Sequence, residues 1–224
     1  MTMPCQALVL DFGGVISRTL FETHDLTEAA LGLAAGTLTW RGPFEPEGDP
    51  VWRAMQAGGI SERDYWTHRM HETAALVGED WTDFPQFVGR VRGADPAAVI
   101  RPEALAAIQT ANAAGRKLAI LSNELDLFYG ADFRTKLPFL ADFDVIVDAT
   151  YTGILKPDPR AYQAITCALN LPPEACVFVD DQRKNIDGAR YAGMQTVHFD
   201  VTDPAQSYDE ALAALGISAS VTAV

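Results

Sequence analysis

Apolar and polar positions alternate regularly along the second half of the chain. Short apolar runs predict buried strands at residues 117–121, 143–147, 176–179 and 195–199. Between them, apolar positions at helical spacing predict helices at residues 97–114, 126–137, 158–169, 184–192 and 204–215. Strands that alternate with helices predict a parallel sheet that is covered by helices on both faces.

Residues 17–93 do not follow this alternation. They contain all four tryptophans of the chain, which we expect to form a core of their own. Ser61 followed by Asp64 predicts the N-cap of a helix that runs to about Val77. We therefore expect an α/β fold with a Rossmann-like core of a parallel sheet and helices on both faces, formed by residues 1–16 and 94–224. A helical domain, residues 17–93, is inserted into this core.

An apolar run near the start of the chain ends on Asp11 and is followed by Gly13 and Gly14. This pattern predicts a buried strand that delivers one carboxylate to a tight turn. Backbone amides in such a turn can bind an anion, and the carboxylate can hold a cation or attack an electrophile. Asp11 is therefore the first candidate site residue.

Composition and charge limit the possible partners. The chain has 224 residues, of which 48% are hydrophobic, and a formal net charge of -13. This charge argues against nucleic acid and anionic membranes as partners, although a bound divalent cation would still allow an anionic substrate. No apolar run approaches the ~20 residues of a membrane span, and no signal peptide is evident. We expect a cytoplasmic protein whose thiols at Cys5, Cys167 and Cys176 are reduced and buried. The sequence leaves open whether the chain forms a homodimer.

Four polar signals lie at the ends of predicted strands or just before a predicted helix. In chain order they are Asp11, Ser122 with Asn123, Lys156, and Asp180 with Asp181. The carboxyl ends of parallel strands meet at one edge of a sheet, so we expect these side chains to form one site. Each signal alone also fits a turn, a helix cap or a surface lysine. Two adjacent carboxylates at a buried strand end are costly without compensation, which favours a metal, and oxygen ligands suit Mg²⁺.

Together these motifs resemble the haloacid dehalogenase (HAD) superfamily. Residues 11–15 are similar to its first motif, Ser122-Asn123 to its second, Lys156 to its third, and Asp180-Asp181 with Asn185 to its fourth. The resemblance covers nearly the whole chain, and the helical insert lies where members of subfamily I carry a helical cap. Because most members are Mg²⁺-dependent phosphatases, the resemblance implies hydrolysis of a small phosphorylated metabolite.

The resemblance also implies a role for each site residue. Asp11 would attack phosphorus and form an aspartyl-phosphate, Ser122 would bind a phosphoryl oxygen, and Lys156 would hold Asp11 and the phosphate together. The expected metal ligands are Asp11, Asp181 with support from Asp180, and the main-chain carbonyl of Gly13. The expected substrate contacts are Asn123, Gly14 and, from the cap, Arg41.

Gly13 departs from the family pattern, because most phosphatases of the superfamily carry a second aspartate there as general acid and base. Such a group is typically worth about 10²–10⁴ in rate. The sequence leaves three explanations open. The cap supplies the acid, with Glu22, His24 and Asp25 as candidates; the substrate has a good leaving group; or the chain is no longer a phosphatase.

Two rival functions remain open beside the phosphatase. A 2-haloacid dehalogenase needs neither metal nor second aspartate, and residues 156–162 resemble its third motif. However, its first motif usually has an aromatic residue and a threonine where this chain has Gly13 and Val15, and the acid pair Asp180-Asp181 would repel a carboxylate substrate. The other rival is a non-catalytic binding module on the same fold, against which the retained Asp11 and Lys156 argue.

Overall fold

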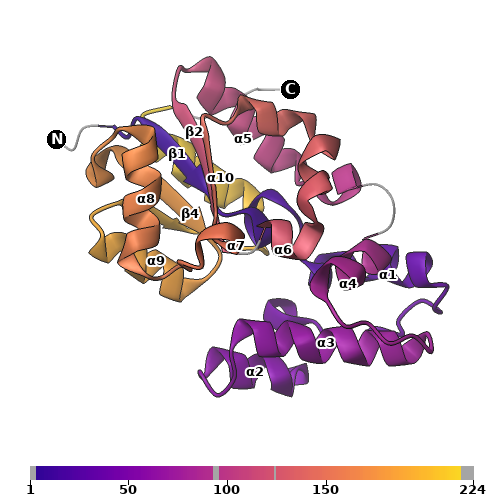
Figure 1. Cartoon of the computed structure of the whole chain (residues 1–224). Helices are drawn as coiled ribbons and strands as arrows, with labels where there is room; N and C mark the ends of the chain where they lie inside the picture. The colour runs from indigo at the N-terminus through magenta and orange to yellow at the C-terminus, as the bar shows by residue number, and fades with distance from the viewer. Residues whose placement is uncertain (1–3, 93–95, 124, 218–224) are drawn as a thin grey trace. The chain divides into compact units, whose positions relative to one another are not determined.

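The computed structural model describes residues 4–92, 96–123 and 125–217. Their contacts group the chain into two compact units (Figure 1). The sheet unit comprises Met1–Arg18, Ile100–Asp126 and Arg134–Val224, and the helical unit comprises Thr19–Val99 together with Leu127–Phe133. Each unit is described by itself below.

The sheet unit is built on five parallel strands. They are β1 (Ala7–Leu10), β2 (Lys117–Ser122), β3 (Val145–Asp148), β4 (Cys176–Asp180) and β5 (Gln195–His198), in the spatial order β3-β2-β1-β4-β5. Leu10 at the end of β1 pairs with Ile120 on one side and with Val179 on the other. This sheet confirms the α/β fold that the alternating pattern predicts.

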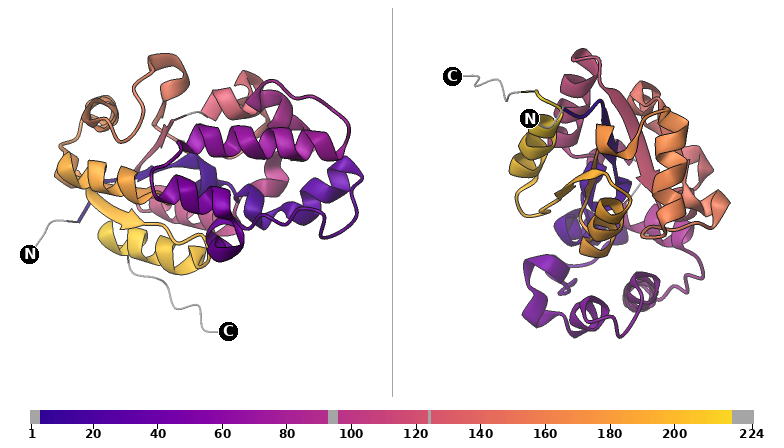
Figure 2. Two further views of the ribbon diagram at one scale, coloured as in Figure 1. Left: turned by 90° about the horizontal axis from the view of Figure 1, so that it is seen from below. Right: turned by 90° about the vertical axis from the view of Figure 1, so that its left-hand side faces the viewer.

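Helices cover both faces of the sheet (Figures 1 and 2). α5 (Pro102–Ala113) and α10 (Pro204–Ala214) pack on one face, and α8 (Pro159–Leu169) and α9 (Arg183–Tyr191) pack on the other. A parallel sheet buried on both faces needs apolar side chains on both faces of its central strands. β1 and the residues Cys176 to Val179 of β4 meet this requirement, since all are fully buried.

The strand order fixes where a ligand can bind. β2 lies on one side of β1 and β4 on the other, so the sheet changes its winding direction beside β1. In open α/β sheets, the crevice outside the carboxyl ends of the strands at such a switch point is the usual ligand site. Asp11 follows β1 and Asp180 ends β4, so both carboxylates lie at this point.

Three predictions from the sequence are wrong in detail. Residues 126–137 are not one helix: α6 (Leu125–Tyr129) ends at Gly130, whose φ of 78° belongs to the left-handed region, and a 3₁₀ helix (Ala131–Lys136) follows. The helix predicted from residue 97 begins at Pro102, because Ile100 pairs with Ser17 in an isolated β-bridge. Cys167 is exposed rather than buried, because it lies on the outer face of α8.

The helical unit has a largely aromatic core. Its longer helices are α1 (His24–Leu31), α2 (Pro50–Gln56), α3 (Glu62–Leu76) and α4 (Phe84–Val91). Trp40 and Trp81 are buried in this core and Trp52 and Trp66 pack against it, as the sequence predicts. Ser61 and Asp64 form a reciprocal capping box at the start of α3, which confirms the predicted N-cap.

The remaining helices are short. They are α7 (Ala149–Thr152), the π-helical turn Phe12–Ile16, and the 3₁₀ helices Leu20–Glu22, Gly42–Phe44, Pro46–Gly48, Pro96–Val99, Pro138–Asp142 and Pro173–Ala175. Among the described residues, no helix is both long enough and apolar enough to cross a membrane.

Candidate active site

Asp11 stands at the point where β1 leaves the sheet. Its main-chain N–H still donates to Val179 O at 2.9 Å, which fixes the residue against β4. The chain then enters the turn Phe12–Ile16, in which Phe12 O accepts the N–H of Ser17 at 2.9 Å. The Asp11 side chain retains 13% of its exposure, so its carboxylate is held by the fold yet reachable from solvent.

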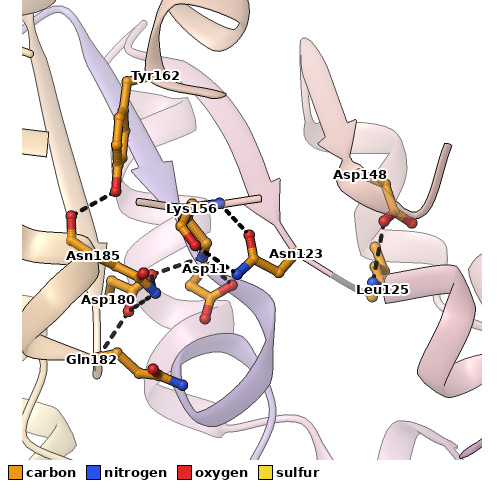
Figure 3. Close-up of polar contacts among 9 residues, drawn as sticks. All are labelled: Asp11, Asn123, Leu125, Asp148, Lys156, Tyr162, Asp180, Gln182 and Asn185. Carbon is orange, nitrogen blue, oxygen red and sulfur yellow. Dashed lines mark hydrogen bonds and ion pairs between the residues drawn. The ribbon is translucent and has the colours of Figure 1, made fainter. Parts of the chain in front are cut away.

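Lys156 is the cation of this site. Its Nζ lies 2.8 Å from Asp11 Oδ1 and 2.7 Å from Asp180 Oδ2, and its side chain is 1% exposed (Figure 3). Burial alone would lower the pKa of Lys156, but the adjacent carboxylates of Asp11 and Asp180 outweigh it and raise the pKa above its usual range. Lys156 is therefore a permanent positive charge between two carboxylates.

The Asp180 carboxylate is fully engaged by hydrogen bonds. Its Oδ1 accepts the N–H of Gln182 at 2.8 Å, both oxygens accept from Asn185 Nδ2 at 3.0 Å, and Oδ2 accepts from Lys156 (Figure 3). The Asn185 main-chain carbonyl in turn accepts the hydroxyl of Tyr162 at 2.7 Å. These bonds hold Asp180 as an orienting anion for Lys156 and for the start of α9.

Asn123 grips the main chain of Lys156. Its Oδ1 accepts the N–H of Lys156 at 2.6 Å, and its Nδ2 donates to Lys156 O at 3.2 Å (Figure 3). Because both ends of the amide are used in this way, Asn123 positions the lysine in addition to the substrate contact predicted for it. Ser122, the last residue of β2, is 6% exposed and stands in register with Asp148 of β3.

Asp148 is a site-supporting residue that the sequence analysis missed. Its buried carboxylate accepts the N–H groups of Leu125 at 3.2 Å and of Asp126 at 2.8 Å, which caps α6 just after Ser122-Asn123. It also accepts the N–H of Thr150 at 2.9 Å and pairs with Arg134 at 3.1 Å. The sequence does contain a signal for this role: Asp148 directly follows the strand predicted at residues 143–147, and an acid at such a position commonly caps a helix.

Burial dominates the electrostatics of Asp11. It raises the pKa of the Asp11 carboxyl above its usual range, and the nearby Asp180 carboxylate adds to the rise, while Lys156 opposes it. A further cation beside Asp11 would favour the ionised form, which is the form able to act as a nucleophile.

The donor set fits a hard divalent cation. One carboxylate oxygen from each of Asp11, Asp180 and Asp181 lies within 4.8 Å of the others. Oxygen-only ligands of this kind suit Mg²⁺. Asp180 already accepts four hydrogen bonds, which leaves its carboxylate little capacity for a direct metal contact.

Gly13 is not required by the backbone. Its φ of -70° and ψ of 128° are ordinary for any residue, and a Cβ placed on it meets no atom within 4 Å. Gly14, by contrast, has a φ of 78°, which strongly favours glycine. The departure at position 13 therefore has no steric cause within the turn.

Two of the three candidate acids of the helical unit are poorly suited to donate a proton. Glu22 uses its carboxylate to accept the N–H and hydroxyl of Thr19, at 2.8 and 2.7 Å. His24 is buried, and burial lowers its pKa to about 4, so it is already neutral at pH 7. Asp25 is exposed. Arg41 also belongs to the helical unit, so it is not among the residues that the sheet unit brings together.

Comparisons with known proteins agree with this architecture. The family profile of haloacid dehalogenase-like hydrolases matches residues 5–193. The chain is 34% identical over 232 residues to the plasmid protein CbbY of Cupriavidus necator, which covers 94% of this chain and 84% of that protein. It is 39% identical over 95 residues to phosphatase MT3486 of Mycobacterium tuberculosis, covering 42% of this chain but only 43% of the phosphatase.

A solved structure also shares the fold. The L-2-haloacid dehalogenase of Xanthobacter autotrophicus aligns with a TM-score of 0.54 and 18% identity, covering 87% of this chain and 77% of that one. At this identity the likeness concerns the fold and does not extend to the reaction. With the family profile matching residues 5–193 and the helical segment inserted after the first strand, this chain belongs to the haloacid dehalogenase-like hydrolases.

Proposed function

We propose that this hydrolase is a Mg²⁺-dependent phosphatase that removes phosphate from a small metabolite through an aspartyl-phosphate on Asp11. The observation that carries the proposal is the carboxylate cluster: Asp11, Asp180 and Asp181 each place an oxygen within 4.8 Å of the others, and Lys156 contacts Asp11 and Asp180. A bound Mg²⁺ would screen the repulsion between carboxylate and phosphate and polarise the phosphoryl group. The relative named as a phosphatase supports the same reaction, although the alignment covers less than half of it.

In the first proposed step, an Asp11 carboxylate oxygen bonds to phosphorus while the bond from phosphorus to the ester oxygen breaks. Lys156 keeps the attacking carboxylate in place through its 2.8 Å contact and neutralises charge on the phosphoryl oxygens. Ser122 donates its hydroxyl to a phosphoryl oxygen at the end of β2. In the second step, water attacks phosphorus and the bond to Asp11 breaks, which returns the free carboxylate and releases inorganic phosphate.

The absence of an acid at Gly13 restricts the leaving group. The departing oxygen carries the electron pair of the broken bond and needs a proton unless it is stable as an anion. Glu22 and His24 are poor proton donors, because the Glu22 carboxylate accepts hydrogen bonds from Thr19 and the His24 ring is neutral at pH 7. We therefore propose substrates whose leaving groups are weakly basic, such as aryl, acyl or anomeric phosphates, ahead of simple alkyl phosphates.

A leaving-group series tests the proposal. The purified protein is assayed with p-nitrophenyl phosphate, sugar 1-phosphates and alkyl phosphates, with Mg²⁺ and with a chelator in its place. We expect Mg²⁺-dependent phosphate release, with the weakly basic leaving groups faster by about 10²-fold or more. Equal rates across the series would show that another group supplies the acid. Chloride released from 2-chloropropionate without Mg²⁺ would replace the phosphatase with the dehalogenase.

Substitution at position 13 makes the test specific. Gly13→Asp has open space and an ordinary backbone, so it is expected to fold and to raise the rate with alkyl phosphates about 10-fold or more, while p-nitrophenyl phosphate gains little. Gly13→Asn is the matched control, because it has the same shape and cannot donate an acidic proton. A gain of equal size in both variants would contradict the leaving-group explanation.

A further inference from the structure

The turn that follows Asp11 is held by two side chains that belong to none of the four motifs. Arg101, the residue before α5, donates to the carbonyl of Gly14 from both Nε, at 3.1 Å, and Nη2, at 3.0 Å. Its main-chain N–H donates to Ile16 O at 3.0 Å. Tyr208 of α10 donates its hydroxyl to Val15 O at 3.0 Å. Three consecutive carbonyls of the turn are thus bound by distant parts of the sheet unit.

This clamp, Arg101 with Tyr208, is buried and linked to the motif at the end of β4. Arg101 is 2% exposed and Tyr208 is 3% exposed. The guanidinium lies 5.5 Å from the centre of the Phe199 ring, and that ring lies 5.2 Å from the ring of Tyr208. Phe199 donates its N–H to the carbonyl of Asp180 at 2.9 Å. The same small cluster therefore contacts the main chain of the first motif and of the fourth.

Burying the Arg101 guanidinium costs desolvation free energy, which a neutral side chain at the same place would not. Removing a charge from water is unfavourable unless its donors are used well. Two donors on one carbonyl and an aromatic face offset part of that cost, because charge-assisted hydrogen bonds are stronger than neutral ones. A neutral side chain could pack here without this penalty. The charge, with two of its N–H groups donating to one carbonyl oxygen, therefore points to a positioning role.

The direction of the Gly14 carbonyl matters for the site. A residue has only two soft backbone dihedrals, and fixing the carbonyls of residues 14, 15 and 16 leaves the turn little freedom. Asp11 immediately precedes that turn, and Gly13 is its second residue. A shift of about 1 Å in a nucleophile costs about 10²-fold in rate even when the chemistry is unchanged.

We infer that Arg101, assisted by Tyr208, is a positioning residue for phosphoryl transfer. Its two hydrogen bonds to the Gly14 carbonyl fix the turn Phe12–Ile16, and with it the positions of Asp11 and of the Gly13 carbonyl. The inference rests on the proposed function for its kinetic part. Its structural part, that the clamp restrains the turn, does not depend on the reaction.

The test uses Arg101→Met, Arg101→Lys and Tyr208→Phe. We expect Arg101→Met to lower kcat about 10²-fold with KM changed less than about threefold, because positioning is lost and binding is kept. Arg101→Lys keeps the charge and one donor and is expected to restore kcat at least tenfold relative to Arg101→Met (about 1.4 kcal/mol). Tyr208→Phe removes one hydroxyl and is expected to lower kcat less than Arg101→Met does.

Lys117→Met is the matched control, because Lys117 also donates a cationic N–H to a main-chain carbonyl, Leu169 O at 2.7 Å, but at the opposite end of β2. It is expected to leave kcat within twofold. Hydrogen exchange of the amides of residues 12–17 is measured in all variants. We expect faster exchange in Arg101→Met and unchanged exchange in Lys117→Met.

Two results would overturn the inference: exchange of residues 12–17 that matches the wild type in Arg101→Met, or a kcat within twofold of the wild type in a folded Arg101→Met. If Arg101→Met does not fold, Tyr208→Phe decides, since it removes only the hydroxyl. The inference is then overturned if Tyr208→Phe has both the kcat and the hydrogen exchange of the wild type. If the wild type releases no phosphate from any substrate, the proposed function fails, and the exchange measurement still decides whether Arg101 restrains the turn.

Discussion

Each of the two units buries a cation against an aspartate. In the sheet unit, Lys156 contacts Asp11 and Asp180 with its side chain 1% exposed. In the helical unit, Arg69 contacts Asp49 with side chains 6% and 0% exposed. Burial and ion pairing alone do not distinguish these clusters, so the difference must lie in what each carboxylate still has available.

Asp49 has no capacity left for a ligand. Its donors are the N–H groups of Trp52 and Gly42, the hydroxyl of Tyr65 and the guanidinium of Arg69. Glu72, the other carboxylate that pairs with Arg69, has a side chain that is 42% exposed. This cluster joins the start of α2 to the middle of α3, and we interpret it as structural.

The cluster around Lys156 is different. Three carboxylates place oxygen atoms within 4.8 Å of one another, Lys156 contacts two of them, and Asp11 keeps part of its exposure. Burial already raises the pKa of Asp11, so the ionised form is costly until another cation arrives. Close carboxylates with oxygen atoms that solvent can reach favour a binding site, whereas a buried ion pair whose lone pairs are all used by hydrogen bonds favours a structural role.

The strongest test of this comparison is to neutralise one aspartate in each cluster. Asp11→Asn is expected to abolish phosphate release, with a loss of at least about 10⁴-fold, because an amide cannot form the aspartyl-phosphate. Asp49→Asn is expected to lower the free energy of unfolding by about 3–5 kcal/mol, since Arg69 loses the buried one of its two anionic partners. The rate of phosphate release and the free energy of unfolding in denaturant are measured for both variants. Full activity in Asp11→Asn would remove the nucleophile assignment, and wild-type stability in Asp49→Asn would remove the structural interpretation.

A smaller effect is expected from the metal. Mg²⁺ should stabilise the folded chain by about 2.7 kcal/mol when its concentration is 100 times the dissociation constant. Asp181→Asn should lose most of this gain, while Glu72→Gln, in the helical cluster, should keep it. Thermal unfolding with and without Mg²⁺ measures the shift. Equal Mg²⁺ stabilisation of wild type and Asp181→Asn would show that the acids of the sheet unit are not the ligands.

The smallest expected effect concerns pH and the helical unit. Burial lowers the pKa of His24 to about 4 from an ordinary value of 6.5. Above pH 6.5 the ring is neutral in both states, and between pH 6.5 and 4 only the unfolded chain gains the proton. The free energy of unfolding should therefore fall as the pH drops through this window. His24→Asn should have a shallower slope there, and identical slopes would contradict the burial of a neutral imidazole.

Local patterns were sufficient to predict much of the fold. The strands were found because each is a short apolar run between turn residues, and the N-cap at Ser61 was found because capping depends on residues three positions apart. The pattern failed between residues 126 and 137, where Gly130 interrupts the helix. The assignment of Leu127–Phe133 to the helical unit was not foreseen, because membership of a unit depends on contacts between distant residues.

The sequence by itself determined the parallel sheet, the helical insert and the candidate residues at the strand ends, because these depend on periodicity and on the order of motifs. Only the tertiary structure decided which atoms meet. It showed that Asn123 binds the main chain of Lys156, that Asp148 caps α6, and that Arg101 binds the Gly14 carbonyl. Hydrogen bonds between residues 87 positions apart, such as the one from Arg101, depend on three-dimensional placement that no local pattern encodes.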